Sequence, residues 1–318
     1  MIIGNVFLLA QIAEGQQVTM TRDDSDAARV CVTNAKGGTG KTTVAINVAG
    51  ALNERGRDVL FVDIDPQGNA TEGLGLVDAY DAAPPTLFDA LTDGNRPTVV
   101  NDLIVEHEEM DVLPASVDLL HAEHELTIAD LMARLDGEAD AAAIEALSSL
   151  TINVDPADIT GGHALDLLSK TLAAVERNYD YVIVDSPPFY GKLTDTGLFA
   201  TRNVLVPALT EASSERAIEL LIEQLTALED HAGITIDTLG VVANRVEQTN
   251  EDQVMLDWLG EVFADYPIWQ VRKRVALQRA FSAGQSVFRY QPSLDITDVF
   301  LDIATEFDRT FGYTEVTA

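Results

Sequence analysis

The sequence predicts an α/β protein with a single doubly wound, mostly parallel sheet and helices on both faces. Short apolar runs alternate with segments that carry apolar residues at three-to-four spacing, which is typical of parallel strands joined by helices. A glycine-rich stretch, residues 35–43, stands between the first such strand and the first such helix. At 318 residues, one large domain accommodates the whole pattern.

The strands and helices are predicted from these periodicities in chain order. Seven apolar runs are predicted as buried strands: residues 29–34, 58–64, 110–114, 181–185, 203–207, 239–244 and 268–271. Five segments are predicted as amphipathic helices: residues 42–54, 165–177, 214–228, 253–263 and 296–311.

The remaining stretches set the expected domain limits. Residues 1–28 show no lasting periodicity and are predicted to be a disordered N-terminal tail, in which Met20 is a candidate for the true start of translation. Residues 29–312 form the predicted domain, and residues 313–318 a C-terminal tail. Within the domain, the stretch from about residue 135 to 162 is acidic and poor in aromatic side chains, which predicts a surface insertion.

The charge is extreme: 52 acidic against 20 basic residues give a net charge of −32. Salt at about 1 M shortens the Debye length to roughly 3 Å and screens such self-repulsion, so the composition predicts a halophilic protein, with an ordinary acidic protein as the alternative. No apolar stretch is long enough to span a bilayer. The first basic residue is Arg22, too late for a secretory signal, and Cys31 is the only cysteine. We therefore expect a cytoplasmic location.

The glycine-rich stretch carries the chemistry of a phosphate-binding loop. Its glycines let successive backbone N–H groups face an anion at a helix N-terminus, a lysine reaches the β- and γ-phosphates, and a hydroxyl can hold Mg²⁺. The predicted ATP-binding residues are Lys36, Gly37, Gly38, Thr39, Gly40, Lys41, Thr42 and Thr43. The usual pattern has a glycine where this chain has Ala35, and a second lysine, Lys36, follows it. The strand, loop and helix predict a P-loop NTPase type of fold.

Two predicted strands end in carboxylates that suit the same site. Asp63 and Asp65 stand at the end of the second strand, and Asp185 ends the fourth in the Walker B form. Carboxylates beside a phosphate loop are needed for Mg²⁺ and for an attacking water. We predict Thr42, Asp63 and Asp185 as metal ligands, although an aspartate at a strand end is also common as a turn former.

Together these motifs resemble the ParA/Soj branch of the deviant Walker A ATPases. The resemblance runs from about residue 29 to 311. It rests on the loop with its extra Lys36, on residues 63–71 (DIDPQGNAT), 113–116 (LPAS), 185–188 (DSPP) and 206–207 (VP) with Glu211, and on residues 280–287.

The resemblance implies an ATP-dependent homodimer in which two protomers sandwich two ATP molecules. Lys36 and Lys41 would contact phosphate, Lys36 from across the dimer interface, and Asp65 would position or activate the water. Asn244 would read the adenine. Relatives in this branch move DNA or other cargo, and a ParB-like partner protein stimulates their slow hydrolysis.

The sequence also separates this branch from its sister families. Iron–sulfur relatives and arsenite-pump ATPases need several cysteines, and MinD-type proteins end in a basic amphipathic membrane helix. Here residues 296–311 hold four acids and one base, so no membrane binding is expected. The chain departs from the branch at residues 268–270 (IWQ), where a proline and an arginine are usual, and at Asp195, where an asparagine is common.

Two function classes remain open: a motor that partitions plasmid or chromosomal DNA, and a positioning or regulatory switch that acts on a protein cargo. Residues 266–294 contain no acid, which favours a DNA-facing surface in so acidic a chain. The predicted non-specific DNA contacts are Arg272, Lys273, Arg274 and Arg279, and Arg289 lies in the same segment. The alternative is that these residues pair with acids that folding brings close.

Overall fold

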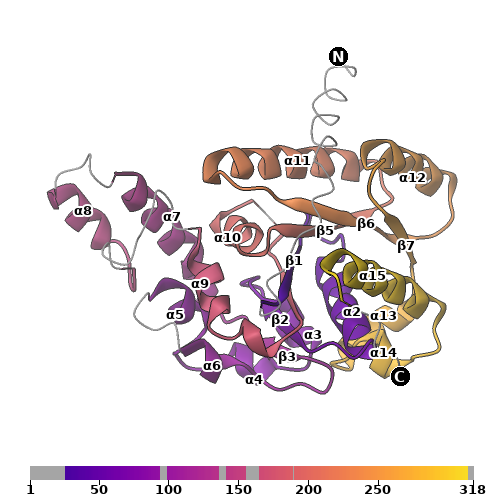
Figure 1. Cartoon of the computed structure of the whole chain (residues 1–318), viewed down its shortest axis with the longest axis horizontal. Helices are drawn as coiled ribbons and strands as arrows, with labels where there is room; N and C mark the ends of the chain where they lie inside the picture. The colour runs from indigo at the N-terminus through magenta and orange to yellow at the C-terminus, as the bar shows by residue number, and fades with distance from the viewer. Residues whose placement is uncertain (1–25, 94–98, 136–140, 155–164, 189, 314–318) are drawn as a thin grey trace, which may run out of the picture.

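The computed structural model describes residues 26–93, 99–135, 141–154, 165–188 and 190–313. In this part of the chain, seven strands form one sheet in the order β3-β2-β4-β1-β5-β6-β7, and all neighbouring pairs are parallel (Figure 1). The strands are β1 (Ala28–Val32), β2 (Val59–Asp63), β3 (Asp111–Leu113), β4 (Tyr181–Asp185), β5 (Asn203–Leu209), β6 (Asp237–Val246) and β7 (Ile268–Arg272). The predicted doubly wound α/β fold is confirmed, and each predicted strand corresponds to one of these seven.

The strands are apolar throughout because both faces of the sheet are covered. Successive side chains of a strand point to opposite faces, so β1 divides its residues between two cores. Val30 and Val32 pack into the core that contains α2 (Lys41–Glu54), whereas Cys31 packs into the opposite core. This two-sided burial explains why strand positions lack the apolar–polar alternation of a half-exposed sheet.

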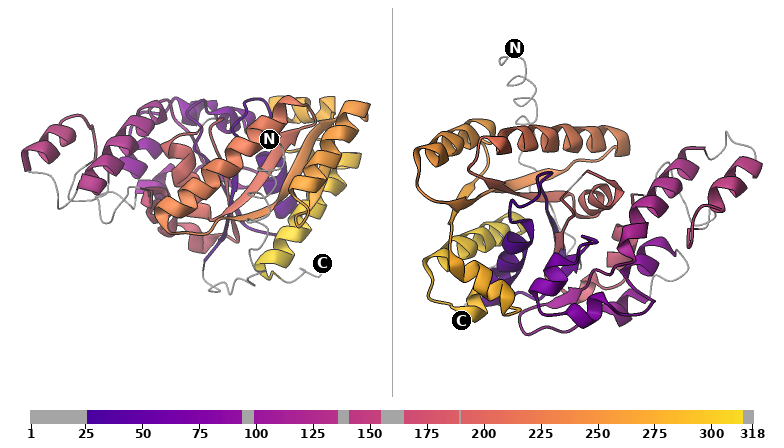
Figure 2. Two further views of the ribbon diagram at one scale, coloured as in Figure 1. Left: turned by 90° about the horizontal axis from the view of Figure 1, so that it is seen from above. Right: turned by 180° about the vertical axis from the view of Figure 1, so that it is seen from behind.

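Helices cover the two faces in separate groups (Figures 1 and 2). One face packs against α2 and α15 (Asp295–Phe311), which also contact each other. The opposite face packs against α10 (Lys192–Thr201), α11 (Ser213–Ala232) and α12 (Asn250–Val262). The other helices are α3 (Asn69–Gly73), α4 (Val77–Tyr80), α5 (Leu87–Thr92), α6 (Val100–Leu103), α7 (Leu119–Leu135), α8 (Ala141–Ser148), α9 (Leu167–Ala173), α13 (Val275–Ser282) and α14 (Val287–Tyr290).

The predicted surface insertion is described over residues 141–154, which include α8. Helices α7 and α8 project from the molecule on the side away from β7 (Figures 1 and 2). The Glu125 carboxylate of α7 is buried and accepts hydrogen bonds from the backbone N–H groups of Ile152, at 2.7 Å, and Asn153, at 3.3 Å. Val154 packs with Met132 of α7. The described part of the insertion is thus anchored to α7 by a buried acid and a small apolar cluster.

The chain ends bear on the predicted limits of the domain. Strand β1 begins at Ala28, one residue inside the predicted tail, and residues 1–25, with Met20, lie outside the described residues. Tyr313 stacks on Tyr181 with ring centroids 4.9 Å apart, so the first residue of the predicted C-terminal tail packs on the domain, while residues 314–318 also lie outside the described residues. No helix in the described part of the chain is long and apolar enough to cross a membrane.

The order of the strands indicates which edge of the sheet can bind a ligand. Strand β1 lies between β4 and β5, and the chain leaves it first toward β2 and β3 and later toward β5, β6 and β7. In open parallel sheets, the carboxyl ends of strands around such a change of direction form the ligand-binding crevice. The segments that follow β1, β2, β4 and β5 therefore meet at one edge.

Candidate nucleotide-binding site

The segment between β1 and α2 has the backbone of an anion-binding loop. Gly38 and Gly40 adopt φ values of +79° and +86°, a left-handed conformation that costs glycine little. Loops of this kind turn successive N–H groups toward one point. Helix α2 begins at Lys41, directly after Gly40, so the partial positive charge of its N-terminus faces the same place.

Two asparagines from strand ends hold this loop in place. Asn34 accepts a hydrogen bond from the Lys36 backbone N–H at 3.0 Å and donates to the Pro207 carbonyl at 2.7 Å. Asn244, two residues before the end of β6, donates to the Thr39 carbonyl at 2.9 Å. A Cβ at Gly40 would lie 2.1 Å from Asn244 Nδ2, so both the space and the φ value require glycine there.

The Asn244 side chain is thus engaged within the protein. Its Oδ1 also accepts the Arg245 backbone N–H at 2.9 Å, and the residue is 2% exposed. Its predicted contact with adenine stays a prediction, and the structure adds a role in shaping the phosphate loop. The sequence carried no signal for that role, because Asn244 and Thr39 are 205 positions apart.

The two lysines of the loop have different surroundings. Lys41 is buried, 6% exposed, beside the carboxylates at the strand ends. The Lys36 side chain is 26% exposed, and its Nζ bonds Glu211 Oε2 at 3.0 Å and Ser213 Oγ at 2.5 Å on the segment after β5. Lys41 is therefore fixed inside the site, while Lys36 lies at its rim.

Asp185 and Thr42 form a pair that suits Mg²⁺. The Thr42 hydroxyl donates to Asp185 Oδ2 at 2.7 Å. The other oxygen, Oδ1, is buried and has no hydrogen-bond partner within the described residues. A buried carboxylate oxygen without a partner is costly, and a hydroxyl and carboxylate on a phosphate loop are the oxygen ligands Mg²⁺ takes. These two residues fit the predicted metal.

Both carboxylate oxygens of Asp63 already accept hydrogen bonds within the protein. Its Oδ1 accepts the Asp65 backbone N–H at 3.1 Å, and its Oδ2 accepts both the backbone N–H and the hydroxyl of Thr71, each at 2.8 Å. The Thr71 hydroxyl also accepts the Ala115 N–H at 2.9 Å. Both Asp63 oxygens thus organise the chain after β2. Thr71 lies in the motif of residues 63–71, but no role was predicted for its hydroxyl.

Burial and mutual repulsion shift the protonation of this cluster. Burial raises the pKa of Asp63 to about 7. Burial, followed by the Asp63 charge, raises the pKa of Asp185 well above its usual range. Burial lowers the pKa of Lys41, whereas the charges of Asp185 and Asp65 raise it. Several carboxylates around one ammonium make a site whose charge a divalent cation would balance.

Asp65 lies in a tight turn that follows β2. The Gly68 N–H donates to the Asp65 carbonyl at 2.8 Å, and Asp65 Oδ1 accepts the Gln67 N–H at 2.9 Å. Burial raises the pKa of Asp65, and the Gln67 N–H and Lys41 act against that shift. The turn presents a second carboxylate close to the charges of Lys41 and Asp185.

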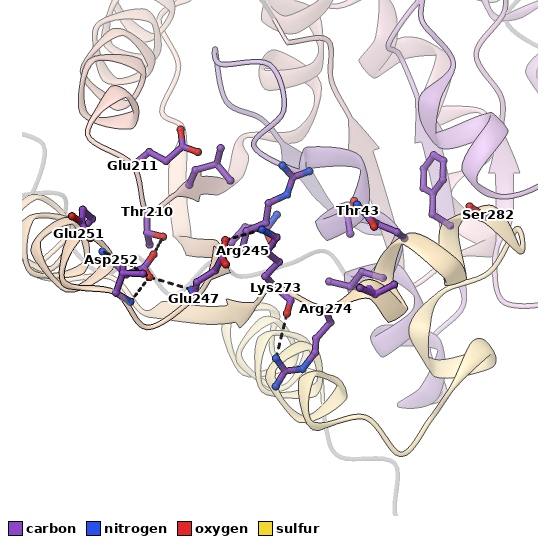
Figure 3. Close-up of a pocket in the computed structure, with 17 residues that line it drawn as sticks. Thr43, Thr210, Glu211, Arg245, Glu247, Glu251, Asp252, Lys273, Arg274 and Ser282 are labelled. Atoms are coloured by element: carbon purple, nitrogen blue, oxygen red, sulfur yellow. Dashed lines mark hydrogen bonds and ion pairs between the residues drawn. The ribbon is translucent and has the colours of Figure 1, made fainter.

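A cavity of about 790 Å³ adjoins the start of α2 (Figure 3). Thr43, Asn244 and Arg245 line it near the phosphate loop, and Glu211 and Lys273 contribute to its walls. The volume is in the range of pockets for small organic ligands, about 300–1,000 Å³. The cavity can therefore hold the base and sugar of a nucleotide whose phosphates occupy the loop.

Most of the predicted DNA-facing residues are paired with acids. Arg274 Nε donates to Asp295 Oδ1 at 3.1 Å, and an Arg272 nitrogen lies 4.0 Å from Asp295 Oδ2. Lys273 Nζ lies 2.8 Å from Glu247. Arg279 is exposed. The surface charge at residues 266–294 is thus partly neutralised by acids that folding brings close, from the segment after β6 and from α15.

The loop, the Thr42–Asp185 pair and the cavity form a candidate nucleotide-binding site with the features of the deviant Walker A class. A family model described as an AAA domain matches residues 27–238. The chain is 31% identical over 281 residues to the sporulation initiation inhibitor protein Soj of Bacillus subtilis, covering 87% of this chain and 96% of that protein. The chain belongs to the ParA/Soj/MinD family of deviant Walker A ATPases.

Other similarities agree with this assignment. The chromosome partitioning protein ParA of Caulobacter vibrioides is 28% identical over 284 residues, covering 87% of this chain and 92% of that one. The structure of a Cyanothece McdA variant in complex with ATP has a TM-score of 0.71 at 20% identity, covering 92% and 100% of the two chains. A cobyrinic acid a,c-diamide synthase from Mycobacterium smegmatis with bound ADP and magnesium has a TM-score of 0.59 at 25% identity, covering 84% and 96%. Related structures thus bind adenine nucleotides with Mg²⁺.

Proposed function

We propose that this chain is an ATP-dependent dimer that partitions plasmid or chromosomal DNA and hydrolyses ATP slowly with Mg²⁺. Membership of a family of ATPases and the similarity to chromosome partitioning proteins support this proposal. The observation that carries it is the second lysine of the loop. Lys41 is buried in the site, whereas Lys36 lies at the rim in an exposed ion pair that water can replace, so its ammonium can leave Glu211 for a second protomer's nucleotide.

The reaction we propose uses the groups of this site as follows. Loop N–H groups and Lys41 would bind the phosphates of ATP, and Thr42 and Asp185 would hold Mg²⁺, which would neutralise charge on the phosphate oxygens. Asp65 accepts a hydrogen bond from the attacking water and orients it. Lys36 of the second protomer adds positive charge to the phosphates, so the site is complete only in the dimer.

Slow turnover follows from the same geometry. Asp65 is the candidate base, yet its carboxylate is already held by the Gln67 N–H and lies near the Lys41 charge. Both interactions oppose the rise in the Asp65 pKa that burial causes, and so limit the strength of this carboxylate as a proton acceptor. We therefore propose that a ParB-like partner stimulates hydrolysis by acting on the dimer.

DNA binding through Arg272, Lys273, Arg274 and Arg279 is the finer part of the proposal. The ion pairs of Arg272 and Arg274 with Asp295, and of Lys273 with Glu247, are exposed and therefore individually weak, so phosphates can compete for these basic groups. The same ion pairs favour a second candidate function: an ATP-dependent switch that positions a protein cargo without binding DNA.

ATP hydrolysis by the purified protein in about 1 M salt, where its charge is screened, tests the function. We expect slow, Mg²⁺-dependent release of phosphate, loss of nucleotide binding in Lys41→Ala, and retained binding without turnover in Asp65→Ala. Turnover by Asp65→Ala at the native rate would contradict the assigned mechanism. No nucleotide binding by the native protein would contradict the function itself.

A further inference from the structure

The turn that carries Asp65 has an outer support in Tyr80, the last residue of the short helix α4. The Tyr80 hydroxyl donates a hydrogen bond to the Pro66 carbonyl at 2.8 Å. The ring also fills the place where a side chain at Gly68 would stand, because a Cβ built there would lie 2.3 Å from Tyr80 Cδ2 and 2.4 Å from Cε2. One side chain therefore contacts the turn at two residues.

These two contacts lie on either side of the group that orients Asp65. Gln67, between Pro66 and Gly68, donates its backbone N–H to Asp65 Oδ1. Gly68 adopts a φ of +61°, a left-handed conformation that is favourable for glycine because it has no side chain. The Tyr80 ring occupies the space where a side chain at residue 68 would lie. Removing the hydroxyl would remove the hydrogen bond to Pro66, and removing the ring would also remove the packing against Gly68. The residues on either side of Gln67 would then be held less firmly.

The opposite side of the turn is fixed separately. Asp63 holds the Asp65 backbone N–H and, through Thr71, the helix α3. Tyr80 itself is half-buried and packs on the core that contains Leu60 and Leu87, so its ring is held by the domain. The turn is therefore clamped between a buried carboxylate on one side and an anchored aromatic ring on the other.

We propose that Tyr80 is a positioning residue for hydrolysis: by clamping residues 65–68 from outside, it sets the orientation of the Asp65 carboxylate toward the attacking water. This inference rests on the proposed function, in which Asp65 orients water. A small displacement of such a group costs far more in the rate of reaction than in the binding of substrate. The hydrogen bond of Tyr80 goes to the turn and not to the phosphate loop.

Tyr80→Phe tests the proposal, because it keeps the ring and removes only the hydrogen bond to Pro66. We expect kcat to fall about two- to tenfold, the range for one hydrogen bond. The dissociation constant for Mg²⁺-ATP, measured with the protein at equilibrium, should stay within about twofold of the native value because no binding contact is lost.

Tyr179→Phe is the matched control. The Tyr179 hydroxyl donates to Asp111 Oδ2 at 2.7 Å. Asp111 is the first residue of β3, so it lies at the amino ends of the parallel strands, opposite the carboxyl ends that form the site. This control loses a comparable hydrogen bond and should keep the native kcat. Hydrogen exchange followed by mass spectrometry should show faster exchange at residues 65–68 in Tyr80→Phe and native exchange there in Tyr179→Phe.

Three results would overturn the proposal: a native kcat in Tyr80→Phe, a loss confined to nucleotide binding, or a lower kcat without faster exchange at residues 65–68. A native protein that does not hydrolyse ATP would contradict the proposed function instead. In that case the exchange comparison alone decides whether Tyr80 holds the turn, since exchange does not depend on turnover.

Discussion

Lys36 of the phosphate loop and Glu211 of the segment after β5 form an ion pair, with Nζ 3.0 Å from Oε2. The contact joins two segments 175 positions apart at the edge of the nucleotide site. It is exposed on the Glu211 side and lowers the pKa of Glu211. In this state Lys36 is bound within its own protomer, so in the proposed dimer Glu211 would compete with the phosphates of the second protomer's nucleotide for the same ammonium.

Glu211→Gln should therefore favour the dimer. The substitution weakens the hold on Lys36 by about 0–1 kcal/mol, so half-maximal dimerisation should need up to about fivefold less ATP. Light scattering over an ATP titration measures this. Glu219→Gln is the control, because Glu219 pairs with the exposed Arg216 on α11, and it should leave the titration unchanged. A higher ATP requirement in Glu211→Gln would show that Glu211 supports the dimer instead.

Asp185→Asn should stabilise the nucleotide-free protein at neutral pH. The raised pKa of Asp185 means that the native state binds a proton more tightly than the unfolded chain does. Ionised Asp185 therefore costs stability above its unfolded pKa, and this cost shrinks as the pH falls. A neutral amide carries no charge to bury beside Asp63, so we expect the variant to be more stable by about 1–3 kcal/mol at pH ~7.5 and this difference in stability to shrink toward pH ~5.

Urea unfolding at fixed salt measures this difference. The same variant should lose the stabilisation that Mg²⁺-ATP gives the native protein, because the Thr42–Asp185 pair would no longer hold the cation. Equal stability of the two proteins at every pH would mean that Asp185 is not a strained buried charge.

Asp295→Asn tests the proposed DNA-facing surface because it removes the acid that pairs with two of its arginines. Arg272 and Arg274 both face Asp295, so removing that charge should tighten non-specific DNA binding by the ATP-bound dimer. Arg272→Glu with Arg274→Glu should remove binding while ATP hydrolysis remains, and Arg216→Glu on α11 is the control.

DNA binding measured by fluorescence anisotropy at several salt concentrations decides this case. If the native dimer binds no DNA at any salt concentration that keeps it folded, the result favours the second candidate function, an ATP-dependent switch that positions a protein cargo.

Glu125→Gln should loosen the insertion without affecting nucleotide binding. The buried carboxylate accepts backbone N–H groups of residues 152–154, and an amide would place donors against them, so we expect a loss of about 1–3 kcal/mol. Limited proteolysis should cut residues 141–154 faster than in the control Glu145→Gln, an exposed acid of α8. Unchanged proteolysis would show that the apolar contacts alone hold the segment.

The parts of the molecule that the sequence predicted are those encoded locally. The strand, glycine-rich loop and helix around Lys41 lie within one continuous segment, and each strand is a continuous apolar run because both faces of the sheet are buried. Helix α5 was not predicted, although the Asp89 carboxylate accepts the Thr86 backbone N–H at 2.8 Å at its start, an arrangement visible in the sequence as a threonine three residues before an acid.

The remaining features depend on contacts between distant segments. Nothing near Asn244 in the sequence indicates that its amide holds the Thr39 carbonyl, and nothing near Arg274 indicates that Asp295 lies opposite. The engagement of both Asp63 oxygens could not be predicted either, because a strand-end aspartate has the same sequence signature whether it binds metal or folds a turn.

The state of association of Asp65→Ala tests the central claim most directly, because this variant should bind Mg²⁺-ATP without consuming it. Light scattering in about 1 M salt should show a stable dimer with Mg²⁺-ATP and a monomer without nucleotide. The double variant Lys36→Ala with Asp65→Ala should bind ATP and stay monomeric. A dimer of the double variant, or a monomer of Asp65→Ala saturated with ATP, would contradict a site completed by the second protomer's Lys36.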